Sequence, residues 1–363
     1  MKNVYIFVMD ITKTGGTERT TLNLYEMLKG NGVNVQIISL AGEDGTLRYG
    51  NPDIVYWKLP ILGTGFLSKL IWFFSFCKRI IAYHFVDNAF FVGTGHNINV
   101  LLSLYKFRRK DIKVVLCEHI QLNSIPRISR KIMGLAYKYS DAIVMLSQSA
   151  KTAFIQNYPF LSGQIYVIPN ALPFSPQENN LMREKRIIMV GRLSAEKGYE
   201  RVIPIAKYLQ LNHPQWRIDI FGDGVLKKEL VDLFYQNGLF NTCIKGVTND
   251  VMSEYMKSSM LIMTSYTEVM PMVILEANAC WLPVIAYECE GTNELIKDGV
   301  NGFIISNENI ADFNKKIDML INDDLKRESM AISSRELSQK YSRDKVVVVW
   351  MSLFDKILGY VQK

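Results

Sequence analysis

Short runs of apolar, largely β-branched residues alternate with amphipathic segments along almost the whole chain. Such alternation is typical of successive βα units, because each buried strand of a parallel sheet is followed by a helix that returns along one of its faces. The sequence therefore predicts an α/β protein with doubly wound sheets. The expected strands are 4–8, 35–40, 54–57, 89–92, 114–117, 142–146, 165–168, 186–190, 218–221, 242–244, 260–263, 284–286 and 303–305.

The pattern is interrupted once, by a polar segment with three prolines between 169 and 180. Such a segment without periodicity is typical of a linker. The 363 residues also exceed the roughly 250–300 at which single cores stop growing. We therefore predict two Rossmann-like domains, one over 1–170 and one over 185–340, joined by a linker over 171–184.

The last segment of the chain, 341–363, has apolar residues at helical spacing, from Val346 to Ile357. It is predicted to form a helix that closes back toward the first domain. Ligands of doubly wound sheets bind outside the carboxyl ends of the strands. Two such domains that face each other would place the site in a cleft between them.

Most of the net charge of +7 belongs to residues 1–180, which hold 19 lysines and arginines against 11 aspartates and glutamates. The basic residues of 106–113 and 127–138 are interleaved with aromatic ones, as on surfaces that contact anionic lipids. An ordinary solvated helix face explains the pattern equally well. The nearly neutral second half and the lack of a nucleic-acid-binding motif argue against a nucleic-acid partner.

No apolar stretch reaches the roughly 20 residues of a membrane-spanning helix. The nearest, 66–76, contains Lys69. The apolar run at the N-terminus is too short for a signal peptide. Five scattered cysteines include no CxxC pair and are expected to be reduced thiols. We therefore predict a cytoplasmic protein that is at most peripheral on the inner face of the cell membrane.

Two glycines follow the first expected strand. Gly15 and Gly16 would let the backbone pass close to a ligand, and Thr17 is expected to cap the helix that follows. This outline of an anion-binding loop matches neither G-x-G-x-x-G nor a Walker loop. Glycine also serves strand-to-helix turns for purely conformational reasons, so the loop alone is a weak signal.

A turn with two cations follows the first strand of the second half. Arg192 provides a planar fork of donors and Lys197 a compact ammonium, and together they can neutralise a diphosphate leaving group. The alternative is a surface pair with Glu196. Further on, Gly222-Asp223-Gly224 ends another strand, and Asp223 is expected to cap the next helix near Val225.

Glu268 and Glu276 are separated by seven residues around Pro271. Since proline fits a first helical turn, Glu268 is predicted in the loop before a helix and Glu276 on its second turn. Carboxylates are natural acceptors for the paired hydroxyls of ribose or hexose, and the amides of a helix start suit a polar or anionic ligand. The alternative is a capping pair on a solvated face.

His119 follows a strand of the first half and is a second candidate for the site, although a lone histidine is more often structural. No cluster of His, Cys and carboxylates has the spacing of a metal site, and no Asp-x-Asp element is present. The sequence therefore predicts neither a metal nor another cofactor.

Taken together and in this order, these motifs resemble the retaining glycosyltransferases of family 4, which have the GT-B fold. The resemblance extends over almost the whole chain. It rests on the loop from Gly15 to Arg19, on Glu118-His119, on Gly191-Arg192 with Lys197-Gly198, on Gly222-Asp223-Gly224 and on the two glutamates Glu268 and Glu276.

The resemblance implies transfer of a sugar from a nucleoside-diphosphate donor with retention of configuration and without a catalytic metal. Arg192 and Lys197 would then bind the diphosphate, which Gly15 and Gly16 would approach, and Glu276 would bind the ribose. The catalytic group would comprise Glu268, His119, Arg192 and Lys197. The transferred sugar would contact His119, Glu268 and the backbone of Val269, Met270, Pro271 and Met272, of which all but the proline have an amide hydrogen to donate.

The expected function is transfer of a hexose or N-acetylhexosamine, most simply from a UDP-sugar, to a glycan or lipid-linked glycan of lipopolysaccharide, capsule or exopolysaccharide. A sugar-nucleotide epimerase with the GT-B fold and a non-catalytic partner subunit are the alternatives. The sequence departs from the family at Val269 and Trp281, where glycine is common. Because positive φ angles are costly for β-branched residues, Val269 is expected to restrict the loop near the sugar.

Overall fold

The computed structural model describes residues 2–13, 15–43, 52–60, 62–63, 65–119, 122, 125–175 and 182–360. The chain divides into two compact units, one formed by Met1–Ala171 with Arg343–Lys363 and the other by Leu172–Ser342. The final helix therefore belongs to the first unit. Of the predicted linker over 171–184, residues 176–181 lie outside the described part.

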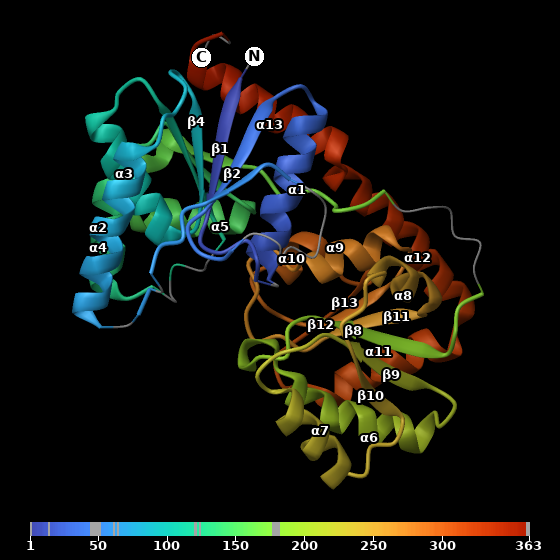
Figure 1. Ribbon diagram of the computed structural model, residues 1–363. Coiled ribbons are helices and arrows are strands. Elements are labelled where there is room, and N and C mark those ends of the chain that lie inside the picture. The colour runs from blue at the N-terminus through green and yellow to red at the C-terminus, as the bar shows by residue number, and fades with distance from the viewer. Residues whose placement is uncertain are drawn as a thin grey trace. The chain divides into compact units, whose positions relative to one another are not determined.

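The first unit is a parallel sheet covered by helices (Figure 1). Its strands follow one another in space as β3-β2-β1-β4-β5-β6-β7. They are β1 (Asn3–Val8), β2 (Asn34–Ser39), β3 (Ile54–Tyr56), β4 (Phe90–Thr94), β5 (Lys113–Glu118), β6 (Ala142–Met145) and β7 (Ile165–Val167). The helices are α1 (Gly16–Gly30), α2 (Phe66–Ala82), α3 (His96–Arg108), α4 (Arg127–Tyr137), α5 (Gln148–Asn157), the 3-10 turn η2 (Pro159–Gln164) and α13 (Arg343–Leu358).

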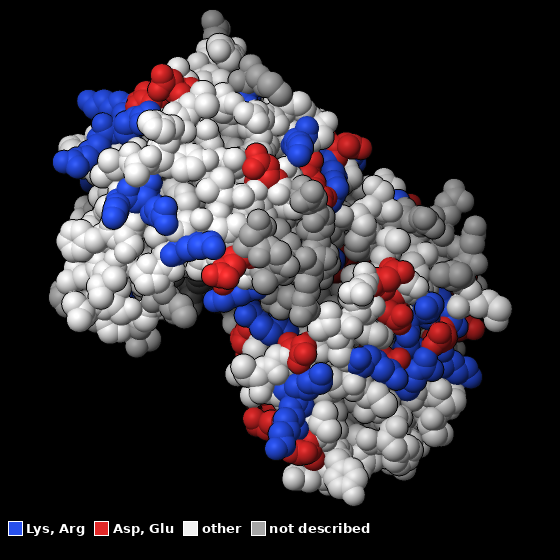
Figure 2. Space-filling model, viewed as in Figure 1, with Lys and Arg blue, Asp and Glu red and all other residues white. Residues whose placement is uncertain are grey.

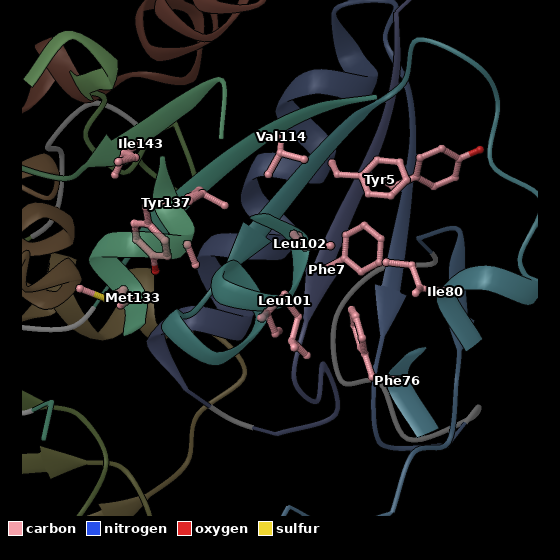
Figure 3. Close-up of a cluster of buried hydrophobic side chains, with 14 of the residues drawn as sticks. Tyr5, Phe7, Phe76, Ile80, Leu101, Leu102, Val114, Met133, Tyr137 and Ile143 are labelled. Carbon is pink, nitrogen blue, oxygen red and sulfur yellow. The ribbon is translucent and has the colours of Figure 1, made fainter. Parts of the chain in front are cut away.

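Alternate side chains of each strand enter different cores. Tyr5 and Phe7 of β1 belong to a core that also holds residues of α2, α3, α4 and α5 (Figure 3). Ile6 and Val8 belong to a second core, with residues of α1 and α13. A strand buried on both faces reads as a continuous apolar run, which is why the sequence pattern of this sheet was so plain.

The second unit repeats the architecture, with strand order β10-β9-β8-β11-β12-β13. Its strands are β8 (Arg186–Val190), β9 (Arg217–Phe221), β10 (Thr242–Gly246), β11 (Met260–Met263), β12 (Val284–Tyr287) and β13 (Gly302–Ile305). Its helices are α6 (Val202–Asn212), α7 (Lys227–Gln236), α8 (Val251–Lys257), α9 (Met272–Ala279), α10 (Thr292–Leu295), α11 (Ile310–Asn322) and α12 (Asp324–Ser338), with 3-10 turns η3 (Ala195–Lys197), η4 (Tyr199–Arg201) and η5 (Gln339–Tyr341).

The predicted α/β class with two doubly wound sheets is confirmed, and each predicted strand is found within two residues of its expected ends. Two predicted helix caps are wrong. Helix α1 begins at Gly16 with Gly15 as its N-cap, so Thr17 lies inside the helix. Helix α7 begins at Lys227 after Leu226, and the Asp223 carboxylate instead accepts a hydrogen bond from the Gly224 amide at 2.9 Å.

Candidate functional site

The order of strands reverses direction at one point in each sheet, between β1 and β4 in the first and between β8 and β11 in the second. Loops that leave the sheet on either side of such a point diverge and open a crevice at the carboxyl ends of the strands. In the second unit these loops hold the predicted cations, after β8, and the first predicted glutamate, after β11.

The two loops are joined by an ion pair. Lys197 Nζ lies 2.5 Å from Glu268 Oε1, and both side chains are largely buried. The Ser265 hydroxyl donates to the same carboxylate oxygen at 2.9 Å. The structure therefore brings together two sequence-predicted site residues that are 71 positions apart.

Backbone contacts hold the two loops in register. Gly198, which follows Lys197, has φ +58, and a Cβ there would lie 2.5 Å from the carbonyl oxygen of Thr264. The Tyr266 amide donates to the Glu196 carbonyl at 2.9 Å. Because Gly198 permits both the left-handed backbone and the close approach, it fixes where the Lys197 side chain leaves the turn.

Arg192 lies on the same loop with a different environment. Its side chain is 57% exposed, and its guanidinium is 3.9 Å from the Glu196 carboxylate. An exposed pair of this length contributes little to stability, so the guanidinium is available to an anion. The predicted alternative, a surface pair with Glu196, is thus a real contact for Arg192, whereas Lys197 pairs with Glu268.

The loop after β9 lies directly against the loop after β8. A Cβ on Gly222 would lie 1.8 Å from the Gly191 carbonyl oxygen, and one on Gly224 would lie 2.3 Å from that of Leu193. The Leu193 amide also donates to the Asp223 carbonyl at 2.9 Å. These glycines are therefore packing requirements that let two backbones run side by side beneath Arg192.

Glu276 is on the second turn of α9, as predicted, and its side chain is completely buried. The Tyr255 hydroxyl of α8 donates to Glu276 Oε2 at 3.1 Å. Pro271 is the N-cap of α9 and not its first helical residue. Sequence reasoning missed Tyr255 and Ser265, because nothing in a single sequence indicates which hydroxyl faces a given carboxylate.

Val269 does not strain the loop in the way the sequence suggested. Val269 is not among the described non-glycine residues that have a positive φ angle. The loop is held instead by Gly291, whose amide donates to the Glu268 carbonyl at 2.9 Å. A Cβ at Gly291 would lie 2.8 Å from the Val269 carbonyl oxygen, so the backbone that leads into α9 depends on this glycine.

Trp281 is the second departure from the family, and it does have positive φ, at +61. It is the residue after the C-cap of α9, where the Leu282 amide donates to the Ala277 carbonyl and the Trp281 amide to that of Asn278. This is a Schellman motif, whose left-handed position glycine normally occupies.

We predict that Trp281→Gly gives a more stable protein than Trp281→Ala, by about 1 kcal/mol, which reverses the usual order of these residues near helices. Both variants lose the indole, so their difference isolates the backbone strain. Urea unfolding of the two variants measures it. An alanine variant at least as stable as the glycine variant would contradict the assignment of strain.

In the first unit, the predicted glycine loop leads from β1 into α1. Among the described residues, a Cβ on Gly16 would meet no atom within 4 Å, and the atoms nearest to one on Gly15 would be those of the Glu18 carboxylate. Gly15 itself has an extended backbone at φ −153. The loop thus leaves open space beside the first turn of α1, at the point where the strand order of the first sheet reverses.

His119 and its neighbour Glu118 lie against different helices of the first unit. His119 follows β5 and lines a cavity with Thr94 and residues of α1, and burial lowers the pKa of its imidazole to about 4. Glu118 accepts hydrogen bonds from Asn99 Nδ2 at 2.5 Å and from the Tyr137 hydroxyl. Burial raises the pKa of Glu118 to about 7. His119 is therefore neutral at pH 7, and Glu118 is a structural residue.

The raised pKa of Glu118 predicts a specific pH dependence of stability. Between about pH 4.5 and pH 7 the native carboxyl holds a proton that the unfolded chain has lost, so rising pH destabilises the wild type. In Glu118→Gln this contribution is absent. The variant should gain stability relative to wild type as the pH rises from 4.5 to 7, measured by urea unfolding; His119 contributes equally to both proteins and cancels.

Within the described residues no group of three or more His, Cys, Asp or Glu is arranged to hold a metal ion. The same part of the chain has no helix with the length and apolar character needed to cross a bilayer.

The chain matches two family descriptions that together extend over nearly all of it. Residues 14–175 match "Glycosyltransferase Family 4" and residues 173–337 match "Glycosyl transferases group 1". An uncharacterised glycosyltransferase of Methanocaldococcus jannaschii is 30% identical over 77% of this chain and 83% of its own length. The chain belongs to glycosyltransferase family 4. The family predicted from the motifs is therefore confirmed.

Two bacterial relatives of this family 4 glycosyltransferase match it over their full length. An uncharacterised glycosyltransferase of Haemophilus influenzae is 29% identical over 97% of this chain and 100% of its own. The amylovoran biosynthesis glycosyltransferase of Erwinia amylovora is 27% identical over 98% of this chain and 100% of its own. One of these relatives is thus named for the biosynthesis of amylovoran.

Solved structures confirm the predicted GT-B fold. The Anabaena protein HepE, in a complex with UDP and glucose, superposes with a TM-score of 0.80 at 19% identity and covers 97% of this chain and 100% of its own. The pneumococcal O-GlcNAc transferase GtfA, in a complex with UDP and GlcNAc, reaches 0.82 at 11% identity over 98% of this chain and 99% of its own.

Proposed function

We propose that this glycosyltransferase moves a hexose or N-acetylhexosamine from a UDP-sugar to a glycan or lipid-linked glycan during surface polysaccharide synthesis, with retention of configuration and without a metal. The observation that supports this function best is the Lys197–Glu268 pair at the reversal point of the second sheet. A cation for the diphosphate and a carboxylate for the sugar hydroxyls are there held side by side.

In this proposal the protein stabilises charge and positions the reactants. Arg192 and Lys197 bind the diphosphate, so that the negative charge that develops on the leaving group is neutralised. Glu268 accepts hydrogen bonds from hydroxyls of the transferred sugar, and the backbone amides of Val269, Met270 and Met272 donate hydrogen bonds to its oxygens. Because the leaving phosphate takes the proton of the acceptor hydroxyl on the same face, no separate protein base is needed.

The remaining predicted residues have supporting roles. Glu276 accepts from the ribose hydroxyls, which would compete with the Tyr255 hydroxyl for the carboxylate. In the first unit, Gly15 and Gly16 offer backbone amides to the phosphates, in keeping with the open space beside Gly16. His119 contacts the sugar as a neutral imidazole, which donates one hydrogen bond and accepts another.

The polymer and nucleotide are inferred from relatives. The Erwinia amylovora relative is named for amylovoran biosynthesis, and a Staphylococcus aureus relative is a poly(ribitol-phosphate) α-N-acetylglucosaminyltransferase, 23% identical over 59% of this chain. The HepE and GtfA complexes both contain UDP. These names favour a UDP-sugar and a polymer acceptor over a small soluble one.

A thermal-shift panel of nucleotide sugars tests the donor site. A donor at 100 times its dissociation constant should stabilise the wild type by about 2.7 kcal/mol. Arg192→Ala and Glu276→Ala should lose that shift. Anomeric proton NMR of the product then tests retention, and turnover in EDTA tests independence from metal. Free epimer formed without an acceptor would instead identify an epimerase, and a panel without any shift would favour a non-catalytic subunit.

Contact with an anionic membrane surface is the second element of the proposal. Four apolar side chains of α4 and the turn after it, Ile128, Ile132, Leu135 and Tyr139, are exposed and spaced as one stripe along the helix. On α2 the exposed residues Leu67, Ile71, Phe74 and Ile81 form a similar stripe. Both helices cover the same face of the first sheet.

Exposed cations flank these stripes, among them Arg127, Lys131 and Lys138 of α4 and its end. Figure 2 shows Lys and Arg gathered beside a wide uncharged surface on the side of the first unit that α2, α3 and α4 form. An apolar stripe bordered by cations fits the interface of a bilayer that contains anionic lipid. A lipid-linked acceptor would be held at the same surface.

We predict that the protein binds vesicles with phosphatidylglycerol more tightly than pure phosphatidylcholine vesicles, and that salt weakens the binding. Ile128→Ser/Ile132→Ser should reduce partitioning into the vesicles by about tenfold or more, because full burial of one isoleucine side chain contributes about 1.5–3 kcal/mol. Val348→Ser/Val349→Ser, exposed on α13 over the other face, is the matched control. Equal partitioning of both double variants would refute the assigned surface.

A further inference from the structure

The chain passes between its two units twice, at Ala171–Leu172 and at Ser342–Arg343. The two passages lie side by side, since the Leu172 amide donates to the Tyr341 carbonyl at 2.8 Å. Any change in the orientation of one unit relative to the other must therefore alter the backbone at these two places.

One buried side chain of α1 contacts both passages. Asn23 Nδ2 donates to the Ala171 carbonyl at 2.6 Å, and Asn23 Oδ1 accepts from Arg343 Nε at 2.7 Å. The same guanidinium reaches Glu26, one turn further along α1, at 2.7 Å. Asn23 is only 5% exposed, so its carboxamide has both its donor and its acceptor committed in a site with little access to water.

The position of Asn23 on α1 connects these passages with the proposed site. Helix α1 begins at Gly16, directly after the glycine loop, and Asn23 lies two turns further on. A cavity of about 30 Å³ adjoins Asn23, Ala171 and His119. It is also lined by Thr21, whose buried hydroxyl has no hydrogen-bond partner among the described residues. The space is large enough for a water.

We propose that Asn23 is a positioning residue for the transfer reaction. Its side chain ties both passages to the helix that begins at the glycine loop. The proposal rests on the proposed function, because it assigns donor contacts to both units. Loss of the carboxamide would leave the buried Ala171 carbonyl without its donor and let the passages shift against α1. Misplacement of about 1 Å can cost about a hundredfold in rate.

The test compares Asn23→Ala with Asn241→Ala in the full chain. Asn241 is also buried and donates to a backbone carbonyl, that of Trp216, at 3.2 Å, but it lies within the second unit before β10. Asn23→Ala should lower the kcat of donor turnover by ten- to a hundredfold, with water or a sugar as acceptor. The dissociation constant for UDP, measured by calorimetry, should change less than threefold. Asn241→Ala should change neither by more than twofold.

A second variant and a second measurement keep the test decisive. Asn23→Asp retains the acceptor for Arg343 but replaces the donor to Ala171 with an oxygen, so it should also lower kcat. Independently of catalysis, Asn23→Ala should speed hydrogen exchange at the Leu172 amide and leave β1 amides unchanged. Unchanged kcat in both variants, or unchanged exchange at Leu172, would overturn the proposal. A wild type that neither binds UDP nor turns over a donor would instead refute the proposed function.

Discussion

Replacement of Lys197 by alanine should lower turnover of the donor by about a hundred- to a thousandfold, the range seen when one preorganised charge-stabilising group is removed. The ammonium lies 2.5 Å from Glu268 in a largely buried position. Because the charge of the leaving diphosphate grows as the glycosidic bond breaks, loss of the Lys197 ammonium destabilises the transition state more than the bound donor. The UDP dissociation constant should rise by about tenfold.

A matched control separates this effect from the loss of any ion pair. Lys257 lies 3.6 Å from the Glu254 carboxylate in the same unit, but at the end of α8 that leads into β11, away from the carboxyl ends of the strands. Lys257→Ala should leave kcat within twofold of wild type. Lys197→Arg retains the charge and should recover part of the activity. If Lys197→Ala kept a third or more of wild-type turnover, the assigned role of Lys197 would be wrong.

The strands and helices of both units could be predicted because they depend on patterns that burial imposes directly. Strands such as β8 and β11 are buried on both faces, so their apolar runs mark them even without neighbours. The caps could not be predicted with the same success. A threonine or an aspartate near a helix start has several possible local hydrogen-bond partners. In the structure Gly15 is the N-cap of α1 in place of Thr17, and Asp223 accepts from the Gly224 amide without capping a helix.

The candidate site was predictable as a set of residues and unpredictable as a set of contacts. Lys197 and Glu268 follow strands that neighbour each other, which places them on the same sheet edge from topology alone. The direction of each side chain depends on loop conformations that one sequence does not reveal. Sequence reasoning accordingly considered Glu196 as the partner of both cations, whereas Gly198 directs Lys197 to Glu268.

Gly222→Ala should be among the most destabilising single methyl additions in this protein, at about 3 kcal/mol or more. Its Cβ would lie 1.8 Å from the Gly191 carbonyl oxygen and 3.0 Å from the carbonyl carbon. Neither backbone can move aside cheaply. The Gly191 amide donates to Phe221 at 3.0 Å, and the Gly222 amide donates to Gly246 at 2.8 Å. The methyl group therefore disrupts β8, β9 and β10 together.

For a unit of this size, such a loss corresponds to a fall in Tm of about 6–12 °C, at roughly 2–4 °C per kcal/mol. Calorimetry of the full chain measures it. Gly30→Ala is the control, because a Cβ at Gly30 in α1 would meet no atom of the described residues within 4 Å; the variant should be as stable as wild type or gain about 0.5–1 kcal/mol. Since the same contact supports the loop of Arg192, Gly222→Ala should also lose UDP binding below its Tm. A variant that is stable and binds UDP normally would show that the two backbones do not lie as close as the structure has them.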